Sequence, residues 1–363
     1  MNMIELRQVS KRYGGVQALH PVDLSVRKGE FVTLLGASGS GKTTLLNLIA
    51  GMVPPSTGRI VIEGRDVTTS PPSKRQLGMV FQNYALMPHM TVFENIAFPL
   101  RVRRLSRTEI ERKVRDVLAL VRLPDLAARK PRELSGGQQQ RVSLARCIVY
   151  NPALILLDEP LGALDKKLRE QMQLELRRIH AELGITMVNV THDQDEALTM
   201  SDRIVLMNGG RIEQEDRPEA LYFRPATRFA ADFIGTANLL PCDVRTVTDD
   251  GVAVSTVLGD MRATAPGVIA AANPSGAGKS ASLLIRPESI VMRAADAPAG
   301  DDQSVDGILE DTIILGGIVR HHVRVGASLR MVVQEQNRRD RVSLPRDAPV
   351  RLTWSHRDCL VLD

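Results

Sequence analysis

The chain has 363 residues, which is too long for one ordinary hydrophobic core, so two domains are expected. With 43% hydrophobic and 25% charged residues, it is typical of a soluble globular protein. No window approaches the roughly 18 consecutive apolar residues of a membrane-spanning helix, and the first residues lack the basic-then-apolar layout of a signal peptide. We therefore expect a cytoplasmic protein.

The cysteines and the charge exclude further classes. Three cysteines, an odd number set far apart without a C-x-x-C pair, argue against a disulfide framework and against a zinc site. The net charge of +5 is mild, and only 3% of the residues are aromatic, which leaves few stacking surfaces for single-stranded nucleic acid. We expect the basic residues to face solvent or anionic headgroups, and we expect no nucleic-acid partner.

A small β layer is expected at the start of the chain. Residues 3–9 and 22–26 are short apolar runs, and the turn sequence Tyr13-Gly14-Gly15 lies between them. Tyr13 is a candidate for stacking on an adenine ring, although a tyrosine beside two glycines more often serves packing.

A phosphate-binding loop is predicted next. Residues 31–35 are typical of a buried strand, and Gly36–Thr44 matches G-x-x-x-x-G-K-[ST] completely, with a helical segment after it. Its glycines let successive backbone N–H groups turn toward an anion, and the helix N-terminus adds positive partial charge. Lys42 is expected to contact the β and γ phosphates, and the Thr43 hydroxyl to hold Mg²⁺. The motif by itself fits kinases, GTPases, helicases and transport ATPases alike.

Strands and helices alternate through the next stretch. Residues 57–64 predict a hairpin strand, and residues 78–81 predict another short one. A helix is expected to begin near Thr91, with Glu94 completing a capping box. Helical spacing of apolar residues predicts a further amphipathic helix over residues 110–121.

Two motifs follow that carry chemistry. Leu134–Gln138 reads Leu-Ser-Gly-Gly-Gln and precedes a helical stretch for which Ser135 is the natural N-cap. Residues 154–157 form an apolar run that suits a strand buried in a parallel sheet, and Asp158 and Glu159 stand at its carboxyl end. Ligands bind at that edge of open α/β sheets, so the acids and the glycine-rich loop are expected to share one crevice.

The α/β pattern continues to about residue 235. A helix is predicted over residues 168–183, and a buried strand over residues 185–190 brings His192 to the same edge of the sheet. A hairpin is expected across residues 203–214, and Pro218–Ile234 is expected to be helical.

The C-terminal part has a different texture. Residues 236–363 show short alternating segments between Gly, Pro and Asp turns, which predicts a small all-β barrel domain. Its strands are expected at residues 252–258, 282–286, 318–325, 329–333 and 349–354. Residues 274–280 imitate a phosphate loop, but Asn273 occupies the first glycine position, so we interpret them as a surface loop.

The ordered motifs resemble those of the ATP-binding subunits of ATP-binding cassette (ABC) transporters. Leu134–Gln138 is the discriminating motif, because kinases, GTPases and helicases lack it. Within the family the chain is most similar to importer ATPases of the spermidine/putrescine type, and residues 285–288 resemble the signature of their OB-like (TOBE) accessory domain. The implied fold is an α/β P-loop NTPase cassette over residues 1–235, with a helical subdomain at about 86–150, followed by an all-β OB-like domain over residues 236–363.

The resemblance implies a role for each site residue. Glu159 would be the general base, His192 the switch that touches the γ-phosphate, and Tyr13 the adenine-stacking aromatic. Lys42 and Gln82 would join Glu159 and His192 as catalytic groups, Gln82 by sensing Mg²⁺ and the attacking water. The nucleotide would be held by Tyr13, Gly36, Ser38, Gly39, Ser40, Gly41, Lys42, Thr43, Thr44, Gln82, Ser135, Gly137, Gln138, Asp158 and Asp165.

Some of these residues would serve Mg²⁺ or a second subunit. The implied Mg²⁺ ligands are Thr43, Gln82 and Asp158. Ser135, Gly137 and Gln138 would close over the γ-phosphate of ATP bound to the partner, and Asp165 would lie in the dimer contact.

The resemblance also implies partners. Two ATP molecules would be sandwiched in a homodimer on the cytoplasmic face of the inner membrane, docked through residues 82–98 to permease subunits and served indirectly by a solute-binding protein. A polyamine is favoured as the solute; ferric iron, sulfur oxyanions, phosphonates and sugars are the alternatives. A non-transport ABC ATPase acting on nucleic acid is a remoter alternative, and the chain lacks its usual coiled-coil insertion or second cassette. Asn189 stands where the family pattern is more often apolar.

Overall fold

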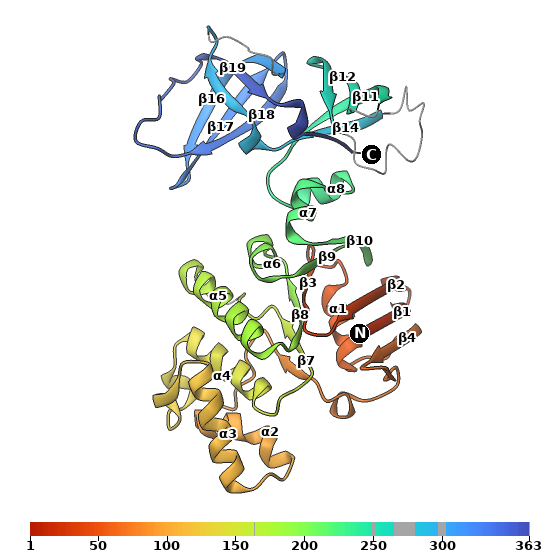
Figure 1. The fold of residues 1–363 in the computed structure, drawn as a ribbon, viewed down its shortest axis with the longest axis vertical. Coiled ribbons are helices and arrows are strands. Elements are labelled where there is room, and N and C mark those ends of the chain that lie inside the picture. The colour runs from red at the N-terminus through yellow and green to blue at the C-terminus, as the bar shows by residue number, and fades with distance from the viewer. Residues whose placement is uncertain (163, 249–250, 265–279, 297–302, 363) are drawn as a thin grey trace. The chain divides into compact units, whose positions relative to one another are not determined.

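The computed structural model describes residues 1–162, 164–248, 251–264, 280–296 and 303–362 (Figure 1). They form two compact units, Met1–Pro218 and Glu219–Asp363, here called the first and the second unit. The division falls earlier than the expected boundary between residues 235 and 236. None of the described helices is long and apolar enough to cross a membrane.

A six-stranded sheet forms the centre of the first unit, in the order β10-β9-β3-β8-β7-β6. Its pairs are parallel apart from β9 with β10, which is the predicted hairpin. Every residue of β3 and β8 is buried, as expected for strands covered on both faces. The strands are β3 (Phe31–Leu35), β6 (Gly78–Val80), β7 (Leu154–Asp158), β8 (Thr186–Thr191), β9 (Arg203–Asn208) and β10 (Arg211–Asp216).

The central sheet has a different core on each face, because successive strand side chains point in opposite directions. Val32 and Leu34 pack with α1 and the four-stranded antiparallel sheet β2-β1-β4-β5, whereas Phe31 packs with the helices of the other face. The N-terminal β layer is thereby confirmed, with longer strands than expected. Its elements are β1 (Asn2–Tyr13), β2 (Val16–Arg27), α1 (Lys42–Ala50), β4 (Thr57–Ile62) and β5 (Arg65–Asp66).

Helices cover the second face of the central sheet and form the predicted helical subdomain, seen with α2, α3 and α4 together at the lower end of Figure 1. The capping box of Thr91 and Glu94 begins α2 as predicted, and Ser135 caps α4. The helices are α2 (Val92–Val102), α3 (Arg107–Leu120), α4 (Gly136–Ile148), α5 (Lys166–Leu183) and α6 (Gln194–Met200). Short 3₁₀ turns lie at Pro72–Lys74, Pro124–Leu126 and Pro131–Glu133.

The prediction of one helical segment from Pro218 to Ile234 is wrong in its middle. The structure has two short helices, α7 (Pro218–Phe223) and α8 (Arg228–Phe233). Pro225 cannot donate a backbone hydrogen bond and disfavours helical backbone at the residue before it, so the first helix ends there. Thr227 then caps the second helix by accepting a hydrogen bond from the Ala230 amide.

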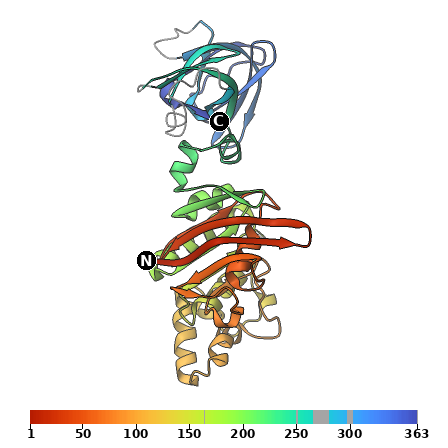
Figure 2. The same cartoon turned by 90° about the vertical axis from the view of Figure 1, so that its right-hand side faces the viewer.

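In the part of the second unit that the structure describes, the elements other than strands are these helices and two 3₁₀ turns at Pro287–Ser289 and His356–Asp358, which confirms the predicted all-β class. Its strands form two five-stranded sheets, β13-β12-β11-β14-β20 and β15-β19-β16-β17-β18, that share one hydrophobic core. Figure 2 shows these strands curving around a common interior. They are β11 (Asn238–Thr248), β12 (Gly251–Thr256), β13 (Gly259–Ala263), β14 (Ser280–Ile285), β15 (Val291–Ala294), β16 (Gln303–Ile314), β17 (Ile318–Val325), β18 (Leu329–Gln336), β19 (Pro349–Trp354) and β20 (Cys359–Leu362).

The five predicted strands of this unit correspond to β12, β14, β17, β18 and β19, and the bounds of β17 and β19 are those expected. The strands β11, β13, β15, β16 and β20 were not predicted. The imitation of a phosphate loop falls on residues 274–279, which lie outside the described residues, and Ser280 begins β14.

Candidate functional site

The parallel strands bring the predicted chemical groups to one edge of the central sheet. The glycine-rich loop follows β3, Glu159 follows β7, and His192 follows β8. Gln82 comes shortly after β6, which pairs with β7. This is the carboxyl edge, where open α/β sheets bind their ligands.

The loop between β3 and α1 depends on its glycines. A Cβ atom on Gly36 would lie 2.3 Å from the Met207 carbonyl oxygen and 2.7 Å from the Ser40 hydroxyl. Gly39 and Gly41 have φ angles of 80° and 96°, in the left-handed region that suits glycine. Ser38 and Gly39 are exposed at the tip of the loop.

Lys42 is the first residue of α1, and its side chain is held inside the loop. Its Nζ atom donates hydrogen bonds to the carbonyl oxygens of Gly36 at 2.7 Å and Ala37 at 2.8 Å. Burial lowers the pKa of Lys42, and the charge of Glu159 opposes this shift. Thr43 is exposed beside it and Thr44 is half-buried, both in the first turn of α1.

Glu159 stands between two polar side chains. Gln82 donates from Nε2 to Oε2 of Glu159 across 3.2 Å, and Nδ1 of His192 lies 3.2 Å from the other carboxylate oxygen. The backbone of Glu159 is left-handed, with φ 44°, and its amide donates to the carbonyl oxygen of Val190. Burial, and secondarily the charge of Glu159, raises the pKa of Asp158. Two neighbouring carboxylates that repel each other in this way suit a site that binds a cation.

Ser135, Gly137, Gln138 and Asp165 form a second group, here called the signature group. The Ser135 hydroxyl accepts from the Gln138 amide at 3.3 Å, and Gln138 Oε1 accepts from the Ser135 amide at 2.9 Å. Asp165 caps α5, and a Cβ atom on Gly137 would lie only 3.0 Å from a methyl of Leu168 in that helix. The N-termini of α4 and α5 are therefore packed together.

Tyr13 ends β1 at the tip of its hairpin with β2. The residue is 47% exposed, and the Lys11 ammonium lies over the ring, 5.0 Å from its centroid.

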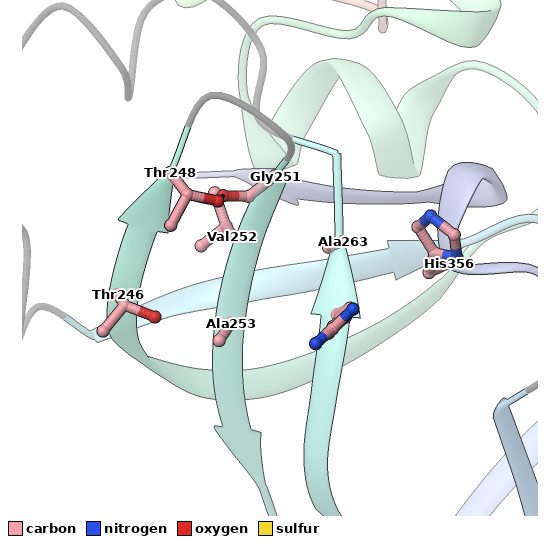
Figure 3. Close-up of a pocket in the computed structure, with 8 residues that line it drawn as sticks. Thr246, Thr248, Gly251, Val252, Ala253, Ala263 and His356 are labelled. Carbon is pink, nitrogen blue, oxygen red and sulfur yellow. Dashed lines mark hydrogen bonds between the residues drawn. The ribbon is translucent and has the colours of Figure 1, made fainter.

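A separate pocket of about 260 Å³ lies in the second unit, on β11, β12 and β13 (Figure 3). Small and hydroxyl side chains line it together with Arg262 and His356. It contains none of the residues that the motifs predicted.

Sequence reasoning missed several groups that hold the site in place. Arg146 in α4 donates to the carbonyl oxygens of Tyr84 and Ala85, just after Gln82. Glu196 in α6 is buried and accepts a hydrogen bond from Asn189. Asn189 was the one available signal, because a polar residue in a wholly buried strand needs a hydrogen-bonding partner.

A strand, a glycine-rich loop with a buried lysine, and an acid pair at the carboxyl edge of a parallel sheet define a P-loop nucleoside triphosphatase. The chain belongs to the ABC transporter family, as the ATP-binding, ATP-hydrolysing subunit of an importer. The family model described as ABC transporter matches residues 19–162, and that of the TOBE domain matches residues 283–362.

The relatives include proteins described as the spermidine/putrescine import ATP-binding protein PotA. The protein of Acidothermus cellulolyticus is 48% identical over 92% of this chain and 87% of its own length. That of Thermobifida fusca is 46% identical over 99% of this chain and 93% of its own. These similarities confirm the family and the importer ATPase class that the motifs predicted.

Solved structures share the fold of the cassette. The dimeric structure of MJ0796, described as a bacterial ABC transporter cassette, has a TM-score of 0.54 and 37% identity, covering 60% of this chain and 99% of that one. The cbiO1 protein of Clostridium perfringens, part of the transporter complex cbiONQ, has a TM-score of 0.58 and 28% identity, covering 61% of this chain and 90% of that one. The predicted cassette fold is confirmed.

Proposed function

We propose that this chain binds Mg-ATP between two of its copies, hydrolyses it and energises the import of a polyamine such as spermidine or putrescine. The observation that carries the proposal is the placement of Glu159 between Gln82 and His192, beside the loop that Lys42 enters. The polyamine follows from the printed descriptions of the relatives. The cassette would occupy residues 1–235, and the accessory domain residues 236–363.

The loop fits the phosphates of ATP. Its glycines leave the backbone N–H groups free of Cβ atoms, and Lys42 places a cation at the centre of the loop. Lys42 would exchange its bonds to loop carbonyls for the β and γ phosphates, at the positive end of α1. The exposed ring of Tyr13 would stack on adenine.

Mg²⁺ suits the donor set at the edge of the sheet. Among the described residues, no three His, Cys, Asp or Glu side chains gather into a metal site, so the ion would depend on nucleotide oxygens together with Thr43, Gln82 and Asp158. Mg²⁺ is commonly held by one or two carboxylates and substrate phosphates. When bound, it neutralises charge on the phosphoryl oxygens.

Glu159 would act as the general base. Gln82 and His192 hold its carboxylate on opposite sides, so the carboxylate is oriented before the attacking water arrives. General-base help is worth about 10² to 10⁴-fold. His192 would then donate to the γ-phosphate, and Lys42 would stabilise the charge on the same group.

The signature group would complete the site of a second copy. The Ser135 hydroxyl offers an O–H donor, and the first turn of α4 offers backbone N–H groups and a positive helix end, which suit a phosphate. They would close over ATP held by the partner, with Gly137 and Gln138 beside them and Asp165 at the dimer contact. A relative of known structure is described as dimeric.

Closure of the dimer would be felt by permease subunits on the cytoplasmic face of the membrane, where this chain would lie peripherally. Residues 82–98 are the proposed docking surface. Pro88, His89 and Phe98 are exposed there, whereas Phe93 packs against the helical core. Docking is therefore best tested at His89 and Phe98, because substitution of Phe93 would also disturb folding. A solute-binding protein would supply the polyamine to the permease from outside.

The hydrolytic site is tested with purified protein and Mg-ATP. Lys42→Ala should abolish phosphate release, and Lys28→Ala, at an exposed lysine, is the matched control. Glu159→Gln should bind ATP, fail to hydrolyse it and accumulate as a dimer. Undiminished activity of Lys42→Ala, or a strictly monomeric Glu159→Gln with ATP, would contradict the proposal.

The solute is tested separately by uptake. Deletion of the gene should abolish import of labelled spermidine or putrescine, and the wild-type chain, but not Lys42→Ala, should restore it. Unchanged polyamine uptake together with loss of iron, sulfate, phosphonate or sugar uptake would overturn the solute while leaving the ATPase assignment intact.

A further inference from the structure

His192 lies in a short turn between β8 and α6, and the residues on either side of it hold the turn in place. The side chain of His192 is 59% exposed, so its position relative to Glu159 depends on the backbone of its neighbours. On one side, the Thr191 hydroxyl donates to Glu196 at 3.1 Å and accepts from the Asp193 amide at 3.0 Å. The residues before and after His192 are therefore joined by hydrogen bonds within the turn.

On the other side, Asp193 uses both carboxylate oxygens. One caps α6 by accepting from the Glu196 amide at 3.2 Å, and the other accepts from Nη1 of Arg169 at 2.9 Å. A helix of so few residues as α6 has little stability of its own, so these contacts decide where the turn lies. The side chains of Arg169 and Asp193 are only 31% and 24% exposed, which protects their pairing from solvent screening.

Arg169 also contacts the segment that leads into Asp165. Its Nη2 atom donates to the carbonyl oxygen of Leu164 at 3.0 Å. A methyl of Leu164 lies 3.4 Å from the Cβ position of Gly136, so this segment packs directly under the start of α4. One planar guanidinium thus joins the turn of His192 to the segment of Asp165, a geometry that the single ammonium of lysine cannot reproduce.

We propose that Arg169 is a positioning residue for ATP hydrolysis, which holds the His192 turn in register with the Leu164–Asp165 segment through Asp193. The inference rests on the proposed roles of His192 and Asp165. When a partner subunit displaces Asp165, the shift would reach His192 through one side chain. Arg169 contacts Asp193 and the Leu164 carbonyl oxygen and is not among the residues proposed to hold ATP, so its loss should lower turnover without weakening ATP binding.

The experiment compares Arg169→Ala, Arg169→Lys and Asp193→Asn with the wild-type chain. Asparagine still caps a helix, so Asp193→Asn removes the ion pair and keeps α6. Arg177→Ala is the matched control, because exposed Arg177 also joins α5 to α6, through the Thr199 carbonyl oxygen near the end of α6 that lies away from the His192 turn. Phosphate release gives kcat and KM, a fluorescent ATP analogue gives nucleotide affinity, and calorimetry gives Tm.

The three variants at Arg169 and Asp193 should lose about 10- to 100-fold in kcat, the scale of a catalytic group misplaced by about 1 Å. Nucleotide affinity and KM should stay within about twofold of wild type, and Tm within about 4 °C of Arg177→Ala. The double variant Arg169→Ala/Asp193→Asn should be no slower than the slower single variant, because both break one connection.

A kcat of Arg169→Ala within twofold of wild type would overturn the inference. So would a double variant whose loss in kcat is the product of the losses in the two single variants. A fall in kcat matched by a large fall in Tm in all three variants would make Arg169 purely structural and would also overturn it. Failure of the proposed function is distinguishable, because Lys42→Ala would then remain active. An inactive Lys42→Ala beside a fully active Arg169→Ala would reject this inference alone.

Discussion

Asn189 donates a hydrogen bond from its Nδ2 atom to Oε1 of Glu196 across 2.9 Å, and both side chains are buried. This contact explains why the polar residue Asn189 occurs in β8, a strand whose residues are all buried. Thr191 donates to the second oxygen of the same carboxylate. A buried acid thus lies directly beneath the turn that carries His192.

Glu196→Gln should change how stability depends on pH. Burial raises the pKa of Glu196 to about 7, although the hydrogen bonds from Asn189 and Thr191 oppose the shift. Between about pH 4.5 and 7 the folded chain keeps this proton and the unfolded chain releases it. The free energy of unfolding therefore falls as pH rises, by at most about 1.4 kcal/mol per pH unit. The glutamine variant lacks this contribution.

Calorimetry at pH 5, 6, 7 and 8 checks the prediction. The Tm of Glu196→Gln should rise relative to that of wild type from pH 5 to about pH 7 and stay level from there to pH 8, and Glu170→Gln, at an exposed position of α5, should run parallel to wild type. Identical pH dependence of Glu196→Gln and wild type would show that Glu196 is ionised in the folded chain throughout.

Arg146→Ala should loosen the turn after Gln82. Tyr84 and Ala85 both have positive φ angles, 59° and 47°, a conformation that costs of order 1–3 kcal/mol for each such residue. Arg146 donates to their carbonyl oxygens at 2.9 Å and 2.7 Å, and the Ser143 hydroxyl adds a bond to Tyr84 at 2.8 Å. Removing the guanidinium leaves these carbonyls short of donors, so we expect a loss of about 2 kcal/mol in stability.

Hydrogen exchange over residues 82–86 is the measurement. These amides should exchange faster in Arg146→Ala, and kcat should fall because Gln82 no longer holds Glu159. Ser143→Ala removes one bond and should show a smaller effect of about 1 kcal/mol. Wild-type exchange at these amides in Arg146→Ala would mean that the turn is held by other contacts.

Local signals made most of the first unit predictable. The glycine loop, the strand ending at Asp158, the capping box that begins α2 and the Ser135 N-cap of α4 depend on residues close together in sequence, and each lies where the sequence placed it. The carboxyl-edge rule then predicted that Glu159 and His192 would lie at the same edge of the sheet. Arg146 was not predictable in the same way, because its partner Tyr84 is 62 positions away and offers only a backbone carbonyl.

The second unit was less predictable for a physical reason. Strand β17 alternates clearly between buried residues and half-buried or exposed ones, β19 does so over its first four residues, and the bounds of both were predicted. Strand β16 alternates weakly, because only Leu309 is fully buried and its other residues are half-buried or exposed. The break between α7 and α8 was marked by Pro225, a strong helix breaker that the prediction of one continuous helix overlooked.

The cysteine thiols should be unreactive in the folded chain. Burial raises the pKa of Cys147 and Cys242 to about 11 and that of Cys359 to about 12. The thiolate is the nucleophile, so alkylation by iodoacetamide at pH 8 should be at least about 100-fold slower than in urea. The rate should rise with pH as the thiolate fraction grows.

Mass spectrometry of the alkylated peptides resolves the three sites. Cys147 is the most informative, because its thiol donates to the Met79 carbonyl oxygen and so reports separation of α4 from β6. Equal alkylation rates in the folded and unfolded chain at any of the three cysteines would contradict the burial found for that residue.

Arg286→Ala should destabilise the second unit. Arg286, in the segment that resembled the accessory-domain signature, is buried and donates to the backbone carbonyl oxygens of Tyr222, Ala231 and Thr236. Its guanidinium also lies 4.3 Å from the centroid of the Tyr222 ring. One side chain therefore fastens the segment of α7 and α8 onto the strands that follow, in agreement with the start of the second unit at Glu219. Truncation leaves three carbonyls without this donor, and we expect a loss of about 3 kcal/mol.

Trp354 makes this loss measurable in the intact chain. It is the single tryptophan of the sequence and is 2% exposed in the core of the second unit, so its fluorescence in urea follows that unit alone. Arg286→Ala should lower the urea midpoint and open residues 224–236 to protease. Arg293→Ala, at an exposed arginine of β15, should leave both unchanged. Because Lys42 lies in the first unit, Mg-ATP should raise the stability of that unit and leave the tryptophan transition of Arg286→Ala where it is.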